Sequence, residues 1–250
     1  MTQPLPIILE TAVQDDKVMQ DFESEPPQVG GDHSQMVKAP PTRGGYGSKD
    51  CVNLASSTAV SRIITIDSPQ GSVLKKIAEP IKLQEFPLAK EIAQALFDSL
   101  KPYLPAAGLA APQIGISKSI FIYSYDRNPD NLTVVINPSF VPIGEETIEE
   151  WEGCFSVLLS RNTWQIAKIP RYKKIRITYT TLEGETIDHV LEGFAAKVFQ
   201  HEYDHLQGVE NIYRKDATVK AFGNKDELEE FFKNIKKTDA EHYLKPTPYR

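Results

Sequence analysis

The stretch VFQHEYDHLQG, which runs from Val198 to Gly208, limits what this chain can fold into more than any other segment. His201 and His205 stand four residues apart, and Glu202 directly follows the first of them. On a helix the two imidazoles lie one turn apart on the same side, where they can share a metal ion. Glu202 then sits beside them as a base for water. The pattern H-E-x-x-H therefore predicts a metal-dependent hydrolytic site.

A buried helix accounts for the residues around the two histidines. The segment between Gly193 and Gly208 is predicted to be helical, since glycines often stand where helices end. Its apolar residues Phe194 and Val198 are followed by the histidines at i, i+4, i+7 and i+11, which is one face of a helix. Two buried imidazoles without partners would be costly, and a metal ion removes that cost.

Two histidines on a helix can also be purely structural, so the pair alone does not establish a metal site. Hydrolytic sites usually hold the metal ion with three protein groups, and a third ligand must therefore be found. Downstream, Glu210 is only five residues beyond the second histidine, and Glu227 and Glu229 lie on a predicted tail helix. These acids are poor candidates. Upstream, Cys154 follows Gly153 in WEGCFSV, although a free cysteine is more often a small buried hydrophobe than a ligand. The residues by themselves leave both roles open for Cys154.

Composition divides the chain into three parts. Residues 1–58 contain paired prolines and glycines and most of the net negative charge, so we expect a largely disordered N-terminal extension. Residues 59–216 are expected to form the catalytic domain, and residues 217–250 an amphipathic helix and a tail. The apolar stripe of that helix, predicted over 225–238, is expected to dock on the domain and consists of Leu228, Phe231, Phe232 and Ile235.

The predicted elements of the catalytic part are a mixture of helices and strands. A helix is expected over 87–104, with one buried face made by Leu88, Ile92, Leu96 and Leu100. Strands are expected over 119–125 and 132–138, which are rich in β-branched and aromatic residues. The segment 173–193 alternates apolar and polar residues on either side of Glu183-Gly184, which predicts a β-hairpin.

Charge and composition argue against several classes of function. The net charge of −6 disfavours general affinity for nucleic acid. No apolar run approaches the roughly 18 residues of a membrane helix. Cys51 and Cys154 are too few for a disulfide framework and fit a reducing compartment. The N-terminal segment is acidic and has no apolar leader, so we expect a cytoplasmic protein.

Three motifs, in order, resemble the signature motifs of the peptide deformylase family. They are GLAAPQIG (Gly108–Gly115), EGCFS (Glu152–Ser156) and QHEYDH (Gln200–His205), and the resemblance covers about residues 60–215. It implies an α+β fold in which small, mostly antiparallel sheets surround a central metal-binding helix. It also implies an enzyme that removes the N-formyl group from the N-terminal methionine of newly made polypeptides and releases formate.

The resemblance also implies the metal ligands and the base. Cys154, His201 and His205 would hold one divalent ion, with water in the fourth place, and Glu202 would take a proton from that water and later protonate the leaving amine. Fe²⁺ is the expected ion, with Zn²⁺, Ni²⁺ or Co²⁺ as alternatives. One thiolate and two imidazoles suit these ions and not calcium or magnesium.

The resemblance implies that further positions contact the substrate. The Gln113 side-chain amide and the Phe155 backbone N–H would donate hydrogen bonds to the oxyanion as the formyl carbon becomes tetrahedral. Gly108 would allow the backbone to approach the substrate, which could pair with a strand edge there. The methionine side chain would enter an apolar pocket lined by Phe194 and Val198.

Four features depart from the family pattern. Ala106 stands where the first motif usually has glycine, and Phe155 replaces the usual leucine of the second motif. Leu158-Leu159 stands where a Pro-Gly turn is common, and the following stretch, which brings in Trp164, is several residues long for the family. None of these changes removes a metal ligand or the base, but they bear on the shape of the substrate channel and on the turnover rate.

Two other functions stay open at this point. A zinc peptidase of the H-E-x-x-H kind should have a third ligand on a downstream helix, and it would leave Gln113 and Cys154 unexplained. A non-catalytic or weakly active deformylase-like protein that binds nascent chains is the other alternative, motivated by the departures and the N-terminal extension. The predicted partners are N-formyl-methionyl nascent peptides, with the ribosome as a further candidate, and neither DNA nor a membrane.

Overall fold

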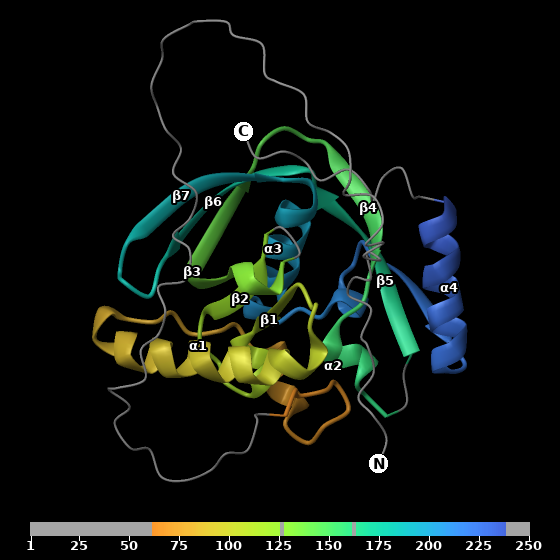
Figure 1. Cartoon of the computed structure of the whole chain (residues 1–250), viewed down its shortest axis with the longest axis horizontal. Coiled ribbons are helices and arrows are strands. Elements are labelled where there is room, and N and C mark those ends of the chain that lie inside the picture. The colour runs from red at the N-terminus through yellow and green to blue at the C-terminus, as the bar shows by residue number, and fades with distance from the viewer. Residues whose placement is uncertain (1–61, 126–127, 162–163, 239–250) are drawn as a thin grey trace, which may run out of the picture. The chain divides into compact units, whose positions relative to one another are not determined.

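The computed structural model describes residues 62–125, 128–161 and 164–238 (Figure 1). The extension predicted over 1–58, with Cys51, and the tail after Thr238 lie outside the described residues, and the division into three parts stays a prediction. Within the described residues, no helix has both the length and the apolar character that crossing a bilayer requires.

Five antiparallel strands form the larger sheet, in the order β1-β2-β3-β6-β7. Their bounds are Gly108–Ala110 (β1), Ile120–Ser124 (β2), Leu132–Pro142 (β3), Lys174–Thr180 (β6) and Thr186–Glu192 (β7). Strands β6 and β7 pair from Lys174↔Glu192 to Thr180↔Thr186, which confirms the predicted hairpin. Gly184 lies in its turn with φ at +83°, a conformation that side chains other than glycine rarely adopt.

A second, three-stranded antiparallel sheet has the order β4-β5-β8. Its strands are Thr147–Glu152 (β4), Trp164–Tyr172 (β5) and Thr218–Phe222 (β8). The α-helices of the described part are Phe86–Leu100 (α1), Phe155–Leu158 (α2), Gly193–Leu206 (α3) and Lys225–Thr238 (α4). Its 3-10 turns are Gly71–Lys75, Leu83–Glu85, Lys101–Tyr103, Ala111–Ile114, Pro129–Asn131 and Asn211–Tyr213.

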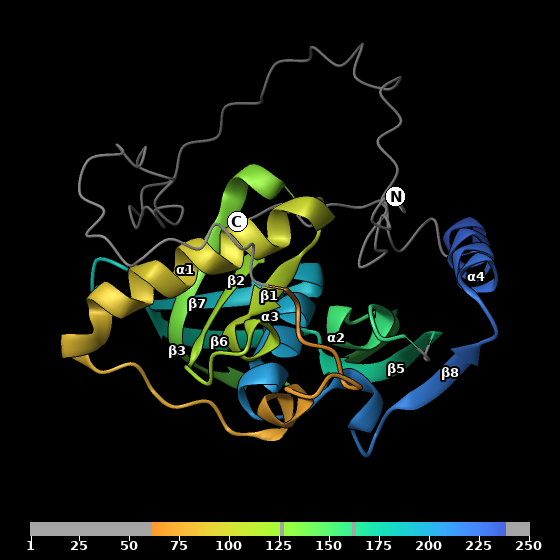
Figure 2. The same ribbon diagram turned by 90° about the horizontal axis from the view of Figure 1, so that it is seen from below.

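All five residues of strand β2 are buried. Because successive side chains of a strand point to opposite faces, both faces of the sheet are covered at this strand. Ile120 and Ile122 belong to the hydrophobic cluster that contains α1. Phe121 and Tyr123 belong to a second cluster, where both rings meet Phe199 of α3 edge to face. Helices α1 and α3 therefore cover opposite faces of the sheet, as Figure 2 shows.

Helix α1 confirms the predicted helix but corrects one residue of its buried face. Ile92, Leu96 and Leu100 are buried, whereas Leu88 is 41% exposed. A strict four-residue spacing drifts by about 40° per step around a helix of 3.6 residues per turn, so Leu88 lies far from the centre of the face. Ala89 takes its place in the core.

Helix α4 docks on the smaller sheet through the stripe predicted for it. Leu228 is buried, and the ring of Phe231 meets Trp151 of β4 at 5.4 Å and Phe222 of β8 at 5.2 Å between centroids. Aromatic pairs of this kind stabilise such a contact beyond the apolar area that they bury.

Helix α3 lies in the middle of the fold, between the two sheets (Figure 1). It packs against β1, β2, β6 and β7 of the larger sheet and against β5 of the smaller one. The arrangement confirms the predicted α+β class, with mostly antiparallel sheets around the helix that carries the two histidines.

Candidate metal centre and active site

Two segments that are far apart in the sequence meet at one buried point. The Sγ atom of Cys154 and one ring nitrogen each of His201 and His205 all lie within 4.8 Å of one another. Cys154 Sγ is 3.5 Å from His205 Nε2. The three residues are buried, with exposed fractions of 0%, 6% and 1%. Their donor atoms are those that borderline-soft divalent ions prefer.

The ends of the local elements hold these ligands in place. Cys154 has extended backbone after β4 and accepts hydrogen bonds at its carbonyl from the first turn of α2, which fixes the position of its side chain. The two histidines come from the last turns of α3, which ends before Gly208. A β-carbon on Gly208 would lie 2.7 Å from backbone carbon of Lys75, and its φ is +72°, so only glycine suits this position.

A carboxylate orients the first histidine. Glu152 Oε2 lies 2.9 Å from Nδ1 of His201, and Arg171 donates to both oxygens of Glu152 at 2.9 Å. Burial alone would raise the pKa of Glu152, but the Arg171 guanidinium and His201 outweigh it and hold that pKa well below its usual range. Because the ionised carboxylate can only accept, Nδ1 of His201 carries the proton and Nε2 is left for a metal ion.

A second carboxylate, Glu210, contacts the other histidine. Its Oε1 lies 3.1 Å from Nδ1 of His205, and its Oε2 accepts from Cys154 Sγ at 3.1 Å. Glu210 is not among the three groups that gather at the ligand position. From its position in the sequence Glu210 is only a poor candidate for a direct ligand, and this contact was not predicted. The one available signal was an acidic residue two positions after a helix-ending glycine.

The electrostatics of the site favour positive charge on the two rings. Burial lowers the pKa of His201, yet hydrogen bonds with Cys154 and Glu152 more than offset it and raise the pKa to about 9. Burial also lowers the pKa of His205. The negative charges of Glu210 and Cys154 outweigh burial and raise this pKa well above its ordinary value. A divalent ion would be stabilised by the same negative groups, so the residues present fit a metal ion.

Glu202 is buried beside this group with part of its carboxylate unsatisfied. Among the described residues, its Oε2 atom has no hydrogen-bond partner. Burial raises the pKa of Glu202 above its ordinary value, against the opposing effect of the nearby histidines. A buried carboxylate oxygen without a protein partner is expected at a position where water or substrate binds.

Gln113 is oriented so that its amide nitrogen points into the site. Its Oε1 accepts from the Ala110 backbone N–H at 2.9 Å, which identifies the other amide atom as Nε2. Nε2 donates to Ser156 Oγ at 3.3 Å and lies 3.7 Å from Cys154 Sγ. The donor predicted from the sequence therefore lies beside the sulfur.

Phe155 is the first residue of α2, so its N–H belongs to a helical turn that has no preceding intrahelical acceptor. Its side chain is not among the residues that line the pocket beside His201 and Glu202. The ring is buried and packs on Tyr103 at 5.1 Å between centroids, which accommodates this departure from the family pattern.

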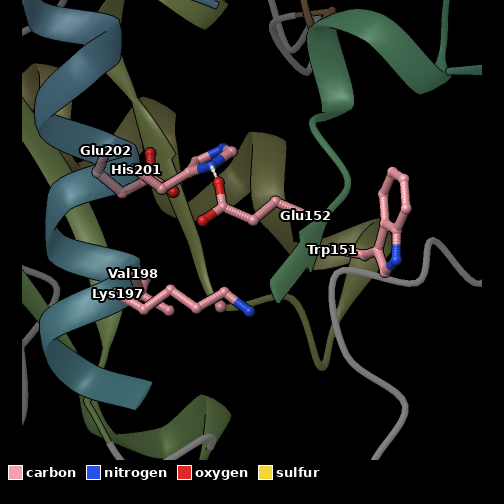
Figure 3. A pocket seen from close by; sticks show the side chains of 7 residues that line it. Trp151, Glu152, Lys197, Val198, His201 and Glu202 are labelled. Atoms are coloured by element: carbon pink, nitrogen blue, oxygen red, sulfur yellow. Dashed lines mark hydrogen bonds and ion pairs between the residues drawn. The ribbon is translucent and has the colours of Figure 1, made fainter. Parts of the chain in front are cut away.

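A pocket opens next to His201 and Glu202, between α3 and β4 (Figure 3). It is lined by Ala107, Trp151, Glu152, Lys197, Val198, His201 and Glu202. Val198 lines this pocket, whereas Phe194 packs against the second hydrophobic cluster and is not among the lining residues. Trp151 and Lys197 were missed. The Lys197 side chain pairs with Glu150 of β4 at 2.7 Å, a contact between strand and helix that no local pattern reveals.

Known proteins resemble the chain over the part that contains this site. The family described as Polypeptide deformylase matches residues 60–238. Peptide deformylase 2 of Ralstonia nicotianae is 39% identical over 145 residues, which cover 55% of this chain and 78% of the relative. The peptide deformylase of Thermotoga maritima is 39% identical over 137 residues, with 55% and 77% covered.

Solved structures show the same likeness. The crystal structure of the Thermotoga maritima peptide deformylase has a TM-score of 0.53 and 37% identity and covers 62% of this chain and 96% of its own. The Met-Ala-Ser-bound class I type b peptide deformylase of Acinetobacter baumannii has a TM-score of 0.54 and 30% identity, with 63% and 100% covered.

Proposed function

Because the chain belongs to the polypeptide deformylase family, we propose that it hydrolyses the N-terminal formamide of formyl-methionyl polypeptides. Water adds to the formyl carbon, the bond from that carbon to the methionine nitrogen breaks, and formate and a free-amine methionyl polypeptide leave. The observation that carries the proposal is the convergence of three distant segments, which brings Cys154, His201 and His205 together beside Glu202 and Gln113.

Cys154 Sγ and the Nε2 atoms of the two histidines would hold one divalent metal ion. When bound, this ion would supply Lewis acidity, which polarises the formyl carbonyl and acidifies water. Fe²⁺ is the ion that we propose, with Zn²⁺, Ni²⁺ or Co²⁺ as alternatives. Glu152 supports the assignment for His201, because it keeps the proton on the opposite ring nitrogen.

Glu202 would move the proton during the reaction. Its buried Oε2 atom has no partner among the described residues, so it is free to accept a proton from the attacking water. The same carboxyl group would then pass that proton to the methionine nitrogen as the carbon–nitrogen bond breaks. The raised pKa of Glu202 brings its proton affinity closer to that needed for both transfers near neutral pH.

Two donors would stabilise the negative charge that develops on the formyl oxygen. Gln113 is held by the Ala110 N–H, so its Nε2 cannot turn away without loss of a buried hydrogen bond. The Phe155 N–H lies at the start of α2, one residue after Cys154. Preorganised donors of this kind each lower a barrier by about 3 kcal/mol.

Edge strands on the two sides of the site are suited to an extended peptide. Strand β1 is at one edge of the larger sheet, and β4 is at one edge of the smaller sheet. Ala107, which precedes β1, and Trp151 of β4 both line the pocket. We propose that the substrate backbone pairs along these edges while the methionine side chain enters the pocket beside Val198. Three points stay predictions: that Phe194 contacts the substrate, that the ribosome is a partner, and that the protein is cytoplasmic.

The test is metal analysis of the anaerobically purified full chain, combined with measurement of formate release from a formyl-methionyl peptide. The wild type should contain one metal ion and release formate. Glu202→Gln should keep the metal and lose about 10²- to 10⁴-fold in kcat. Cys154→Ala should lose the metal, whereas an H-E-x-x-H peptidase would keep it. A fully metal-loaded wild type that releases no formate contradicts the proposal.

A further inference from the structure

We propose that Glu210 is a positioning residue of the metal centre, which holds His205 with Nε2 toward the metal and offsets one charge of the cation. The inference rests on the metal site of the proposed function and adds to it a residue outside the three ligands. It concerns how tightly the ion is held and not the proton transfers of the reaction.

Glu210 contacts two of the three ligands from outside the ligand group. Its side chain is 1% exposed, and its two oxygens each lie 3.1 Å from a ligand residue, one from His205 Nδ1 and one from Cys154 Sγ. The Nε2 atom of the same ring lies on the sulfur side, 3.5 Å from Cys154 Sγ. When Nδ1 carries the proton and donates it in a hydrogen bond to Glu210, Nε2 is left as the atom that binds the ion.

The two carboxylates behind the histidines differ in charge balance. Glu152 is neutralised by Arg171, which donates to both of its oxygens. Within the described part of the chain, no lysine or arginine forms an ion pair with Glu210. Its negative charge is thus left for the metal site.

A count of formal charges shows what that charge does. A divalent ion brings two positive charges, and Cys154 offsets one of them once the proton that it donates to Glu210 has left and the sulfur is a thiolate. The imidazoles are neutral when they bind a metal. Glu210 offsets the second charge, so the ion, its three ligands and Glu210 sum to zero before the carboxylate of Glu202 is counted, and a balanced charge costs least away from water.

The test is a titration of the metal-stripped full chain with Co²⁺ and with Zn²⁺ in competition with a chelator. Glu210→Leu keeps most of the side-chain volume but removes both the acceptor and the charge, and its dissociation constant should rise about 10- to 100-fold, as is typical for outer-shell groups. Glu210→Gln keeps an acceptor for Nδ1 and should lose less. The Co²⁺ absorption bands of Glu210→Leu should shift, because the ring of His205 is no longer held.

Glu227→Gln is the matched control. Glu227 is also a hydrogen-bonded carboxylate, but its contacts are with Gly223 and Asn224 at the start of α4. This variant should lower Tm without a change in the metal dissociation constant or in the Co²⁺ spectrum. A purely structural role for Glu210 would make its variants behave in the same way.

Dissociation constants for Glu210→Leu within twofold of the wild type overturn the proposal. If this variant does not fold, NMR of the histidine side chains in the Zn²⁺-loaded wild type decides the matter. A proton on Nδ1 of His205 supports the proposal, and coordination through Nδ1 overturns it. These measurements use no substrate, so a wild type that binds metal and releases no formate would count against the proposed function alone.

Discussion

Gly108 and Glu202 approach each other so closely that a β-carbon on residue 108 would lie 2.5 Å from Glu202 Oε1. Gly108 belongs to β1 and Glu202 to the buried helix α3, and the atoms that meet are side-chain atoms of Glu202. The side chain of Glu202 can move more easily than the backbone of either element. Gly108→Ala should therefore displace the proposed base. We expect kcat for formate release to fall about 10- to 100-fold, since a shift of about 1 Å at a reacting group can cost this much.

Gly223→Ala provides the control for this substitution. A β-carbon there would also meet a glutamate oxygen, Glu227 Oε1 at 3.2 Å, but near α4 and away from the site. Its kcat should match that of the wild type, and the metal content of both variants should be unchanged. An unaltered kcat in Gly108→Ala would show that Glu202 has more freedom than its burial suggests.

Arg171 is predicted to be essential for stability because it pairs with two acids in the interior. It contacts Glu152 and, at 2.6 Å, Asp204, and its side chain is 3% exposed. Arg171→Met leaves both acids without this partner and should lower the free energy of unfolding by about 3–5 kcal/mol. Urea denaturation measures this directly.

Arg176 is the matched control for Arg171. It forms an equally direct pair with Asp188 at 2.7 Å, but its side chain is 59% exposed. Arg176→Met should change stability little, because water and salt screen exposed pairs. Equal losses in the two variants would contradict the idea that burial gives the Arg171 pair its importance.

Tyr179 should make the protein less stable at alkaline pH. Burial raises the pKa of Tyr179 from 10 to about 12, and its side chain is 5% exposed. Below pH 10 the phenol is neutral in both states and the full stability is present. As pH rises from 10 to 12, the phenol ionises in the unfolded state first. The free energy of unfolding therefore falls by about 2–3 kcal/mol across that window.

Tyr179→Phe tests this pH dependence. Relative to the variant, the wild type should lose about 1.4 kcal/mol for each pH unit above 10, up to the folded pKa. Denaturation at pH 9 and at pH 11 gives the difference. Parallel curves for the two proteins would mean that the phenol reaches water in the folded state.

Helix α4 is predicted to support one wall of the substrate pocket. Phe231 packs edge to face on Trp151, which lines that pocket. Phe231→Ala should free the indole and raise KM for a formyl-methionyl peptide about fivefold, which corresponds to about 1 kcal/mol of lost binding, with kcat nearly unchanged. Lys233→Ala, on the exposed side of the same helix, should leave KM as it is. A fall in kcat with constant KM would instead connect α4 to the chemical step.

Local sequence patterns predicted the features that depend on residues close together in the chain. The hairpin β6–β7 follows from alternation around a turn glycine, and the faces of α3 and α4 follow from helical spacing. Leu88 shows the limit of this reasoning, because spacing gives a face but not the point at which a helix leaves the core. The same limit applies to Phe194, which shares a helical face with Val198 and yet is not among the residues that line the pocket.

The sequence by itself determined the three motifs, the family that they resemble and the paired histidines on one helical face, since short-range spacing decides each of them. Only the tertiary structure brought Cys154 to His205, Arg171 to Glu152 and Glu210 to both a ring and a sulfur. Those contacts join residues from different elements or across a helix end. Their distances follow from how two sheets close around α3, and no periodicity along the chain encodes that closure.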